Sequence, residues 1–350
     1  MSKIPVAILG GTGTVGQRFI QLLVDHPWFE ITAITGSSRS AGRKYGDAVN
    51  WKLEGDPPAQ IAEMIVQPTE PNLDVNIVFS PMPTAQAKEL EPVFAAAGYA
   101  VATNASSYRM TEDVPLLVPE VNPEHSQIID VQRKNRGWKG FIIANANCST
   151  TTAILPLKIL QNAFGLEAVH MVTLQAISGA GYPGVPSLDI MGNVVPYIGK
   201  EDWKLENESK KMLGTYVDGR IEYADIRTSA QANRVPVIDG HLASISVQLG
   251  RDVSPEEAIA AFENWEIPEI VRGLPSCPDR LLVYRHEPDR PQPRLDSNWG
   301  AGLAWTLGKV VPCGVLGLKF MALSHNTLRG AASGSVLNAE LLVTQGYIER

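Results

Sequence analysis

Runs of apolar residues alternate with helix-like stretches through the first 150 positions of the chain. The helix-like stretches, 15–26 and 84–98, separate runs that are apolar almost throughout, which is typical of strands covered on both faces. These strands are expected at 5–10, 30–35, 76–80, 100–104 and 140–145. Because buried strands that alternate with helices form parallel sheets, the pattern predicts a Rossmann-like α/β domain over residues 1–150.

The pattern changes from about residue 165 onward. Residues 168–178 and 240–249 alternate between apolar and polar side chains, as strands do in an antiparallel sheet with one covered face. We therefore predict a second, α+β domain over residues 151–325 with a mainly antiparallel sheet. Residues 326–350 return to a small-residue helical pattern, and we expect this helix to pack back on the first domain.

Two segments of the second domain carry local signals. Ser254, Pro255 and Glu257 have the spacing of a capped helix start with a capping box, so a helix is predicted there. The proline-rich stretch 287–295 is predicted to be a loop.

Composition excludes several classes of protein. The 350 residues carry a net charge of -7 without a polybasic face, so neither nucleic acid nor an anionic membrane is an expected partner. No apolar stretch reaches the roughly 18 residues of a membrane span, and the first residues read as a folded strand without secretory features. The scattered Cys148, Cys277 and Cys313 suit neither a disulfide framework nor a zinc site. We expect no metal and a reducing, cytoplasmic location.

A glycine-rich turn joins the first predicted strand to the first predicted helix. The sequence ILGGTGTVGQRF places Gly11, Gly13 and Gly16 in the G-x-G-x-x-G spacing that lets a backbone approach a pyrophosphate at a helix N-terminus. The alternative is a glycine turn needed only for packing. A dinucleotide is the favoured ligand, bound by Gly11, Thr12, Gly13, Thr14, Val15 and Gly16.

The end of the second predicted strand indicates which dinucleotide binds. An NAD site usually has an acidic residue about 20 positions after the glycine turn, but no acid occurs here before Asp47. Hydroxyls and a guanidinium suited to a 2′-phosphate stand there instead, on Ser37, Ser38, Arg39 and Ser40. NADP(H) is therefore predicted rather than NAD, the alternative being that Arg39 is a plain surface charge.

A single cysteine follows the last strand of the first domain. In NANCSTTT, Cys148 opens a helix, where the helix dipole favours a thiolate. Its alternative is a small core residue. His241 could supply a base, yet it shares the apolar parity of the strand 241–249 and could equally be a core histidine. Arg234 lies seven residues earlier, on the opposite face of a regular strand unless Pro236 and the Asp239-Gly240 turn break the register.

Several motifs in order along the chain carry a resemblance to a known family. They are GGTGTVG, NASSYR, NANCSTT, QAISGAGYPGV, NESKK, RVPVIDGH and SHNTLRGAASG. Over essentially its whole length the sequence resembles the aspartate-semialdehyde dehydrogenases of archaea and fungi. The resemblance implies NADPH-dependent reductive dephosphorylation of L-aspartyl 4-phosphate to L-aspartate 4-semialdehyde, a precursor of lysine, threonine and methionine.

The resemblance also implies roles for particular residues. Cys148 would attack the acyl phosphate and form a thioacyl intermediate, with His241 as general acid/base and Gln175 orienting the substrate. Arg234 would bind the substrate carboxylate and Glu208 its ammonium, while Arg109 and Lys211 would hold the phosphate. Residues expected near the nicotinamide are Ser178, Gly179, Gly181 and Asn326. From the residues alone, Glu208 and Lys211 are a surface ion pair on a helix.

The nearest rival implied by the same resemblance is malonyl-CoA reductase, which forms malonate semialdehyde and needs no carboxylate for an ammonium group. The sheet with one uncovered face also suggests a homodimer or homotetramer.

Overall fold

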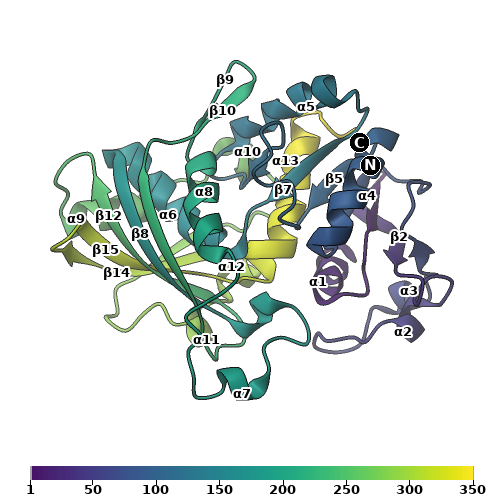
Figure 1. The fold of residues 1–350 in the computed structure, drawn as a ribbon, viewed down its shortest axis with the longest axis horizontal. Helices are drawn as coiled ribbons and strands as arrows, with labels where there is room; N and C mark the ends of the chain where they lie inside the picture. The colour runs from purple at the N-terminus through teal and green to yellow at the C-terminus, as the bar shows by residue number, and fades with distance from the viewer. Residues whose placement is uncertain (1, 350) are drawn as a thin grey trace.

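The computed structural model describes residues 2–349 and shows two large sheets, each with helices packed against it (Figure 1). The first sheet has the strand order β3-β2-β1-β4-β5-β7-β6 in the described part of the chain, and all its neighbours pair in parallel. Its strands are β1 Ile4–Ile8, β2 Phe29–Gly36, β3 Gln67–Pro68, β4 Ile77–Ser80, β5 Ala100–Thr103, β6 Leu116–Leu117 and β7 Phe141–Asn145. The helices of this half are α1 Thr14–Leu23, α2 Tyr45–Ala48, α3 Ala59–Ala62, α4 Thr84–Ala97, the 3₁₀ turn Pro123–Gln127 and α5 Ile128–Arg136.

The second sheet has the order β11-β8-β12-β15-β14-β13 among residues 2–349. The three inner pairs are antiparallel, and the outer pairs β11·β8 and β13·β14 are parallel. Its strands are β8 Leu166–Gln175, β11 Arg227–Arg234, β12 His241–Leu249, β13 Leu282–Arg285, β14 Trp305–Cys313 and β15 Gly317–Ser324, beside a small hairpin of β9 Thr215–Val217 and β10 Arg220–Glu222. The predicted fold class, a Rossmann-like parallel sheet joined to a mainly antiparallel one, is confirmed.

Helices cover one face of the second sheet. α6 (Cys148–Phe164) packs on β8, β12 and β15, and α8 (Glu201–Met212) packs on β11 and α6. On the other face, alternate side chains of β12 remain partly exposed. The remaining short elements are the 3₁₀ turn Ile177–Ala180, α7 Ser187–Ile190, α9 Pro255–Glu263, α10 Glu269–Arg272, α11 Pro293–Asp296 and α12 Trp299–Gly302.

Of the two local predictions for the second domain, the capped helix start is confirmed and the proline-rich loop is partly wrong. The capping box at Ser254 and Glu257 is confirmed, because both of its reciprocal hydrogen bonds form at the start of α9. The prediction that 287–295 is entirely loop is wrong at its end. Pro293 opens the single turn α11, where its fixed φ and missing N–H suit the first helical position.

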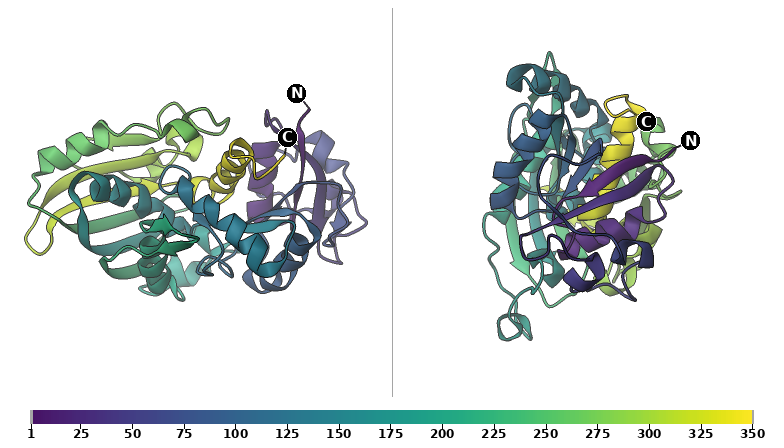
Figure 2. Two further views of the ribbon diagram at one scale, coloured as in Figure 1. Left: turned by 90° about the horizontal axis from the view of Figure 1, so that it is seen from above. Right: turned by 90° about the vertical axis from the view of Figure 1, so that its right-hand side faces the viewer.

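The last helix returns to the first sheet. A short π-helix, Leu328–Ala332, leads into α13 Ser333–Thr344, which packs against α1, β5 and β7. Figure 2 shows α13 between the two halves of the molecule, beside α1. Its small residues belong to the same hydrophobic core as the strands of the first sheet. No helix within residues 2–349 is long and apolar enough to cross a membrane.

A buried polar cluster fixes α13 in this place. Glu340 accepts from Nε2 of His26 at 2.7 Å and from both the Oγ and the N–H of Ser276. The carboxylate is fully buried. It links α13 to His26, which lies just after α1, and to Ser276 in the 275–278 loop. Because removing one partner leaves the others buried and unpaired, Glu340→Ala is expected to lower the free energy of unfolding by about 3–5 kcal/mol in urea titrations. Glu63→Ala, which breaks an exposed pair with Lys44, serves as the control and should change stability little. Equal stability of both variants would contradict the prediction.

Candidate active site

The segment around Cys148 folds as a strand, a cap and a helix. β7 ends at Asn145, and the Oδ1 of Asn147 accepts from the N–H groups of Ser149 and Thr150 at 2.8 and 3.4 Å. This cap places the half-buried Cys148 at the first position of α6, at the positive end of the helix dipole. Within residues 2–349 the N–H of Cys148 itself has no acceptor, so it remains a donor beside the sulfur.

His241 is the imidazole that contacts this thiol. It opens β12, is completely buried, and places Nε2 3.2 Å from Sγ of Cys148. Its Nδ1 accepts from the N–H of Ala176 at 3.1 Å. His241 is therefore a buried core residue, as the strand pattern suggested, and it also contacts the thiol.

Arg234 and Gln175 reach the same place from neighbouring strands. Arg234 ends β11 directly opposite Gln175, the last residue of β8, and His241 begins β12 on the other side of β8. The guanidinium of Arg234 donates to the carbonyl of Ala176 at 2.6 Å. Because the chain changes strands between residues 234 and 241, the two side chains meet at one end of the sheet and not on opposite faces of one strand.

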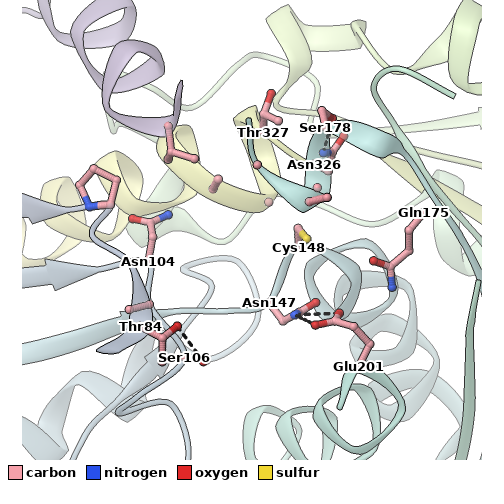
Figure 3. Close-up of a pocket in the computed structure, with 18 of the residues that line it drawn as sticks. Thr84, Asn104, Ser106, Asn147, Cys148, Gln175, Ser178, Glu201, Asn326 and Thr327 are labelled. Carbon is pink, nitrogen blue, oxygen red and sulfur yellow. Dashed lines mark hydrogen bonds between the residues drawn. The ribbon is translucent and has the colours of Figure 1, made fainter. Parts of the chain in front are cut away.

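These side chains line a cavity of about 350 Å³ between the two domains. In Figure 3, Cys148 lies at its centre, with Asn147 and Glu201 on one side and Ser178 and Asn326 on the other. The wall also includes Val15 of the glycine turn, Arg109, Gln175, Gly179, Lys204 and Arg234. Cation-bearing side chains from both domains thus surround one sulfur.

Arg109 lines the cavity, whereas Glu208 does not. The Arg109 guanidinium donates to Glu208 at 3.2 Å and to the carbonyl of Asn104 at 2.8 Å, and its buried Nε has no partner in the described chain. The second oxygen of Glu208 accepts from the N–H of Asn147 at 2.8 Å. Glu208 is 1% exposed and, unlike Glu201, does not line the cavity, so it orients Arg109 and the Cys148 helix and does not reach a ligand.

Lys211 does not fit the phosphate-binding role predicted for it. Its ammonium is fully buried and donates to the carbonyls of Arg109, Thr111 and Val114, each at 2.8 Å. Three donors meeting three carbonyls leave none for a ligand. Burial also lowers the pKa of Lys211 to about 8. In this structure Lys211 holds the 109–114 segment in place.

Two residues that the sequence analysis did not select face the cavity instead. Glu201 and Lys204 stand on α8 with the same i, i+3 spacing as Glu208 and Lys211, two helical turns earlier and so on the same helix face. Lys204 donates to Oε1 of Glu201 at 2.5 Å, and both carboxylate oxygens of Glu201 accept from Nδ2 of Asn147, at 3.1 and 3.0 Å. The repeated Glu-x-x-Lys spacing was visible in the sequence, but only the direction of α8 shows which pair borders the cavity.

The glycine turn has the shape that a dinucleotide requires. Gly10 has φ +76°, which favours glycine, and Gly13 caps α1. A Cβ at Gly16 would lie 2.6 Å from Cα of Gly11, and one at Gly11 would lie 2.5 Å from Ile34, so helix, turn and strand are in close contact. Thr12, Thr14 and Val15 complete the turn, and Thr14 and Val15 border a second cavity that adjoins the first through Val15 and Ser178.

The segment after β2 fits a 2′-phosphate. Ser37, Ser38 and Arg39 are exposed where β2 ends, and the guanidinium of Arg39 forms no ion pair or hydrogen bond within residues 2–349. No carboxylate precedes Asp47 along this segment. An unpaired guanidinium beside hydroxyls suits a phosphate better than a ribose hydroxyl.

Ser178 and Gly181 line both cavities, and Gly179 and Asn326 line the first cavity. The Oδ1 of Asn326 accepts from the N–H of Gly240, and its Nδ2 donates to Oγ of Ser178 at 2.8 Å. A Cβ at Gly179 would lie 2.9 Å from the guanidinium of Arg234 and 2.9 Å from Cε1 of His241. Gly179 therefore allows the backbone to touch both side chains.

Burial controls the protonation of the central pair. Burial, with help from Glu201, raises the pKa of the Cys148 thiol to about 11, although Arg109, Arg234 and Lys204 oppose the shift. Burial together with Arg234 and His325 lowers the pKa of His241 to about 3. Near pH 7 the resting pair is therefore a neutral thiol and a neutral imidazole.

Comparison with known proteins places this geometry in a family. Two family models match the chain, "Semialdehyde dehydrogenase, NAD binding domain" over residues 5–129 and "Semialdehyde dehydrogenase, dimerisation domain" over residues 157–329. An aspartate-semialdehyde dehydrogenase of Archaeoglobus fulgidus is 50% identical over 99% of this chain and 100% of its own length. The aspartate-semialdehyde dehydrogenase of Saccharomyces cerevisiae is 41% identical over 97% of this chain and 98% of its own length.

A solved structure agrees with the sequence relatives. The aspartate-semialdehyde dehydrogenase of Candida albicans, solved with NADP, superposes with a TM-score of 0.91 at 41% identity and covers 99% of this chain and 100% of that one. The matches span both domains, including the glycine turn, the Cys148 helix and the second sheet. The chain belongs to the aspartate-semialdehyde dehydrogenase family.

Proposed function

We propose that the chain catalyses NADPH-dependent reductive dephosphorylation of L-aspartyl 4-phosphate to L-aspartate 4-semialdehyde, as the family name implies. One observation carries the proposal: Sγ of Cys148 lies 3.2 Å from Nε2 of His241 in a cavity that adjoins the glycine turn. The test is an assay of aspartate semialdehyde, phosphate and NADP⁺ in the reverse direction. Absence of phosphate-dependent NADPH formation by the folded protein would refute it.

The chemistry of the cavity suits an aspartyl phosphate. Sγ of Cys148 attacks the acyl carbon, the phosphate leaves, and a thioacyl group remains on the sulfur. The N–H of Cys148 stabilises the oxyanion that forms. The N–H groups of Ser149 and Thr150 are not available for this, because they already donate to the side chain of Asn147. His241, whose Nε2 lies 3.2 Å from the sulfur, acts as the general acid/base that takes up the thiol proton, and Gln175 orients the acyl group.

The charges divide between the two ends of the substrate. Arg234 binds the α-carboxylate, and Glu201 takes the ammonium role first assigned to Glu208. Arg109 and Lys204 hold the phosphate, since Lys211 has no free donor. The glycine turn and Ser37–Ser40 hold NADPH, which supplies the hydride when bound, with Ser178 and Asn326 at the nicotinamide end.

The choice of Glu201 over Glu208 gives a matched pair of variants. Glu201→Gln is expected to raise KM for aspartate semialdehyde about 10- to 100-fold and to affect malonate semialdehyde much less, because a charged partner of the ammonium is lost. Glu208→Gln should mainly lower the melting temperature, since it loosens Arg109 and the α6 cap. Steady-state kinetics with both aldehydes measure this, and an equal loss for both would undo the assignment of Glu201.

Malonyl-CoA reductase is the less favoured function. Its substrate has no ammonium group, so the carboxylate of Glu201 in the cavity wall would have no charged partner on that substrate. The relatives compared above carry the aspartate-semialdehyde dehydrogenase name.

Cofactor choice has its own test. Arg39→Ala is expected to raise the KM for NADPH about tenfold or more and to leave NADH almost unchanged, because only NADPH brings a 2′-phosphate to this guanidinium. Arg43→Ala removes the same charge nearby, where the guanidinium bonds the carbonyl of Asp47. If Arg39→Ala weakens both cofactors equally, or no more than Arg43→Ala does, the 2′-phosphate assignment is wrong.

The second half of the chain supports assembly. It matches the dimerisation domain of the family, and its sheet leaves one face without helices. A homo-oligomer follows, and we propose two or four copies. The cytoplasmic location stays a prediction from the cysteine content.

A further inference from the structure

We propose that Tyr108 positions Arg109 for the substrate phosphate, because its hydroxyl bonds a main-chain carbonyl that Pro92 leaves without a helical donor in α4. This inference deepens the proposed function and rests on the phosphate role given there to Arg109. Tyr108 does not line the cavity. It acts through the backbone of the residue that follows it and is therefore a positioning residue.

The carbonyl in question belongs to Lys88, in the middle of α4. In an α-helix the carbonyl of residue i accepts from the N–H of residue i+4, and here that residue is Pro92, which has no N–H. The Oη of Tyr108 donates to the Lys88 carbonyl at 2.5 Å, within the range of an O–H···O hydrogen bond. A side chain from outside the helix thus replaces the missing helical donor.

The surroundings of Tyr108 keep its hydroxyl a donor. Its ring is half-buried and packs against the hydrophobic core beneath α4. Burial raises the pKa of Tyr108, and the nearby carboxyl of Glu91 raises it further, against an opposite effect of Arg136. The phenol therefore stays protonated at neutral pH and can hold the Lys88 carbonyl under assay conditions.

The segment 104–109 is fixed to α4 at a second point, one helical turn earlier. The Oγ of Ser107 donates to the carbonyl of Thr84 at 2.8 Å, and the Oγ of Ser106 lies 3.4 Å from Oγ1 of Thr84. Thr84 and Lys88 are four residues apart, so both contacts lie on one face of α4. In Figure 3, Thr84, Ser106 and Asn104 stand together across the cavity from Glu201.

Arg109 is held from the other side by the second domain. Its carbonyl accepts from Lys211, and its guanidinium donates to Glu208, both on α8, and to the carbonyl of Asn104. Tyr108 supplies the nearest contact with α4 of the first domain, at the adjacent residue. Without that contact, the Arg109 backbone is free to shift toward α8, and a shift of about 1 Å at a binding group is costly.

The effect is expected to be specific to phosphate. The groups proposed to bind the aldehyde substrate, Arg234 and Glu201, stand on β11 and α8, and the glycine turn that binds the cofactor precedes α1. None of these elements hydrogen-bonds the Tyr108 side chain within residues 2–349. A residue needed only for folding would instead affect all three ligands together.

Steady-state kinetics of aspartate semialdehyde oxidation test the role. Tyr108→Phe removes one hydroxyl and is expected to raise the KM for phosphate about 3- to 10-fold, with the KM values for aldehyde and NADP⁺ changed less than about twofold. Tyr347→Phe is the matched control, because it removes a hydroxyl that donates to Asp130 away from the cavity. An unchanged KM for phosphate in Tyr108→Phe, or an equal rise for all three ligands, would overturn the proposal.

A double-mutant cycle tests the part played by Pro92. Pro92→Ala restores an N–H for the Lys88 carbonyl, which then competes with the Tyr108 hydroxyl. Tyr108→Phe should therefore have little further effect in the Pro92→Ala background, and the double variant should have the same KM for phosphate as Tyr108→Phe alone. Additive effects of the two substitutions would show that Tyr108 does not act through this carbonyl.

A readout without turnover separates this inference from the proposed function. In cofactor-free enzyme, inorganic phosphate should slow iodoacetamide alkylation of Cys148, relative to potassium chloride at equal ionic strength, as followed by peptide mass spectrometry. The half-protecting phosphate concentration should rise about 3- to 10-fold in Tyr108→Phe. No protection, or no change in this variant, would overturn the inference. The expected shift in a protein without turnover would count against the proposed function alone, whereas turnover with unchanged phosphate dependence in Tyr108→Phe would count against this inference alone.

Discussion

Cys148→Ser is expected to lower kcat for phosphate-dependent oxidation of aspartate semialdehyde about 10⁴-fold or more, while NADPH binding stays unchanged. The sulfur is the atom that must hold the acyl group, and a serine hydroxyl is a far weaker nucleophile at neutral pH. NADPH would lie along the glycine turn and Ser37–Ser40, away from the side chain that changes. Steady-state turnover and fluorescence titration with NADPH check the two halves of the expectation.

The other two cysteines provide matched controls. Cys277 lies in the 275–278 loop with its thiol near the carbonyl of Pro278, and Cys313 ends β14. Neither borders the cavity around Cys148. Cys277→Ser and Cys313→Ser should therefore keep most of the turnover. Retained turnover in Cys148→Ser, or an equal loss in a control variant, would remove Cys148 from its role.

The first sheet could be predicted from sequence because its strands are buried on both faces. Such strands appear as short apolar runs, and β1, β2, β4, β5 and β7 all lie where those runs were found. β3 and β6 were not predicted, because each is only two residues long and carries no periodic signal.

β11 shows why the second sheet was harder. Its sequence, RTSAQANR, is polar, because it is an edge strand whose buried residues lie at its C-terminal end. It also pairs in parallel with β8, which alternation within one segment does not reveal. The position of Arg234 opposite Gln175 follows from that pairing, so the sequence alone left Arg234 and His241 on apparently opposite faces.

The site was predictable where chemistry depends on neighbours in sequence. The cap at Asn147 and the thiol at Cys148 adjoin each other, and the glycine turn is contiguous. The assignments of Glu208 and Lys211 depended on which end of α8 approaches the cavity, which is a tertiary property. Glu201 and Lys204 have the same spacing and differ only in their distance along the helix from the Cys148 cap.

The second large effect is expected from a single methyl group. Gly179→Ala should lower kcat/KM for aspartate semialdehyde about 10²- to 10³-fold, although residue 179 carries no functional group. The added Cβ would lie 2.9 Å from the guanidinium of Arg234 and 2.9 Å from Cε1 of His241, closer than such atoms approach, and 3.1 Å from Nε2 of His241. Both side chains must shift, and misplacement of reacting groups by about 1 Å costs about 10²-fold. Stopped-flow and steady-state assays measure the loss, and circular dichroism checks the fold.

Gly273→Ala is the matched control for this substitution. Gly273 ends α10 with φ −96°, and a Cβ there would meet no atom within 4 Å. Both variants add one methyl group, but only the first adds it against the imidazole and the guanidinium. Activity of Gly179→Ala equal to that of Gly273→Ala would mean that His241 and Arg234 can move without cost, and the close packing of this end of the sheet would then have no part in catalysis.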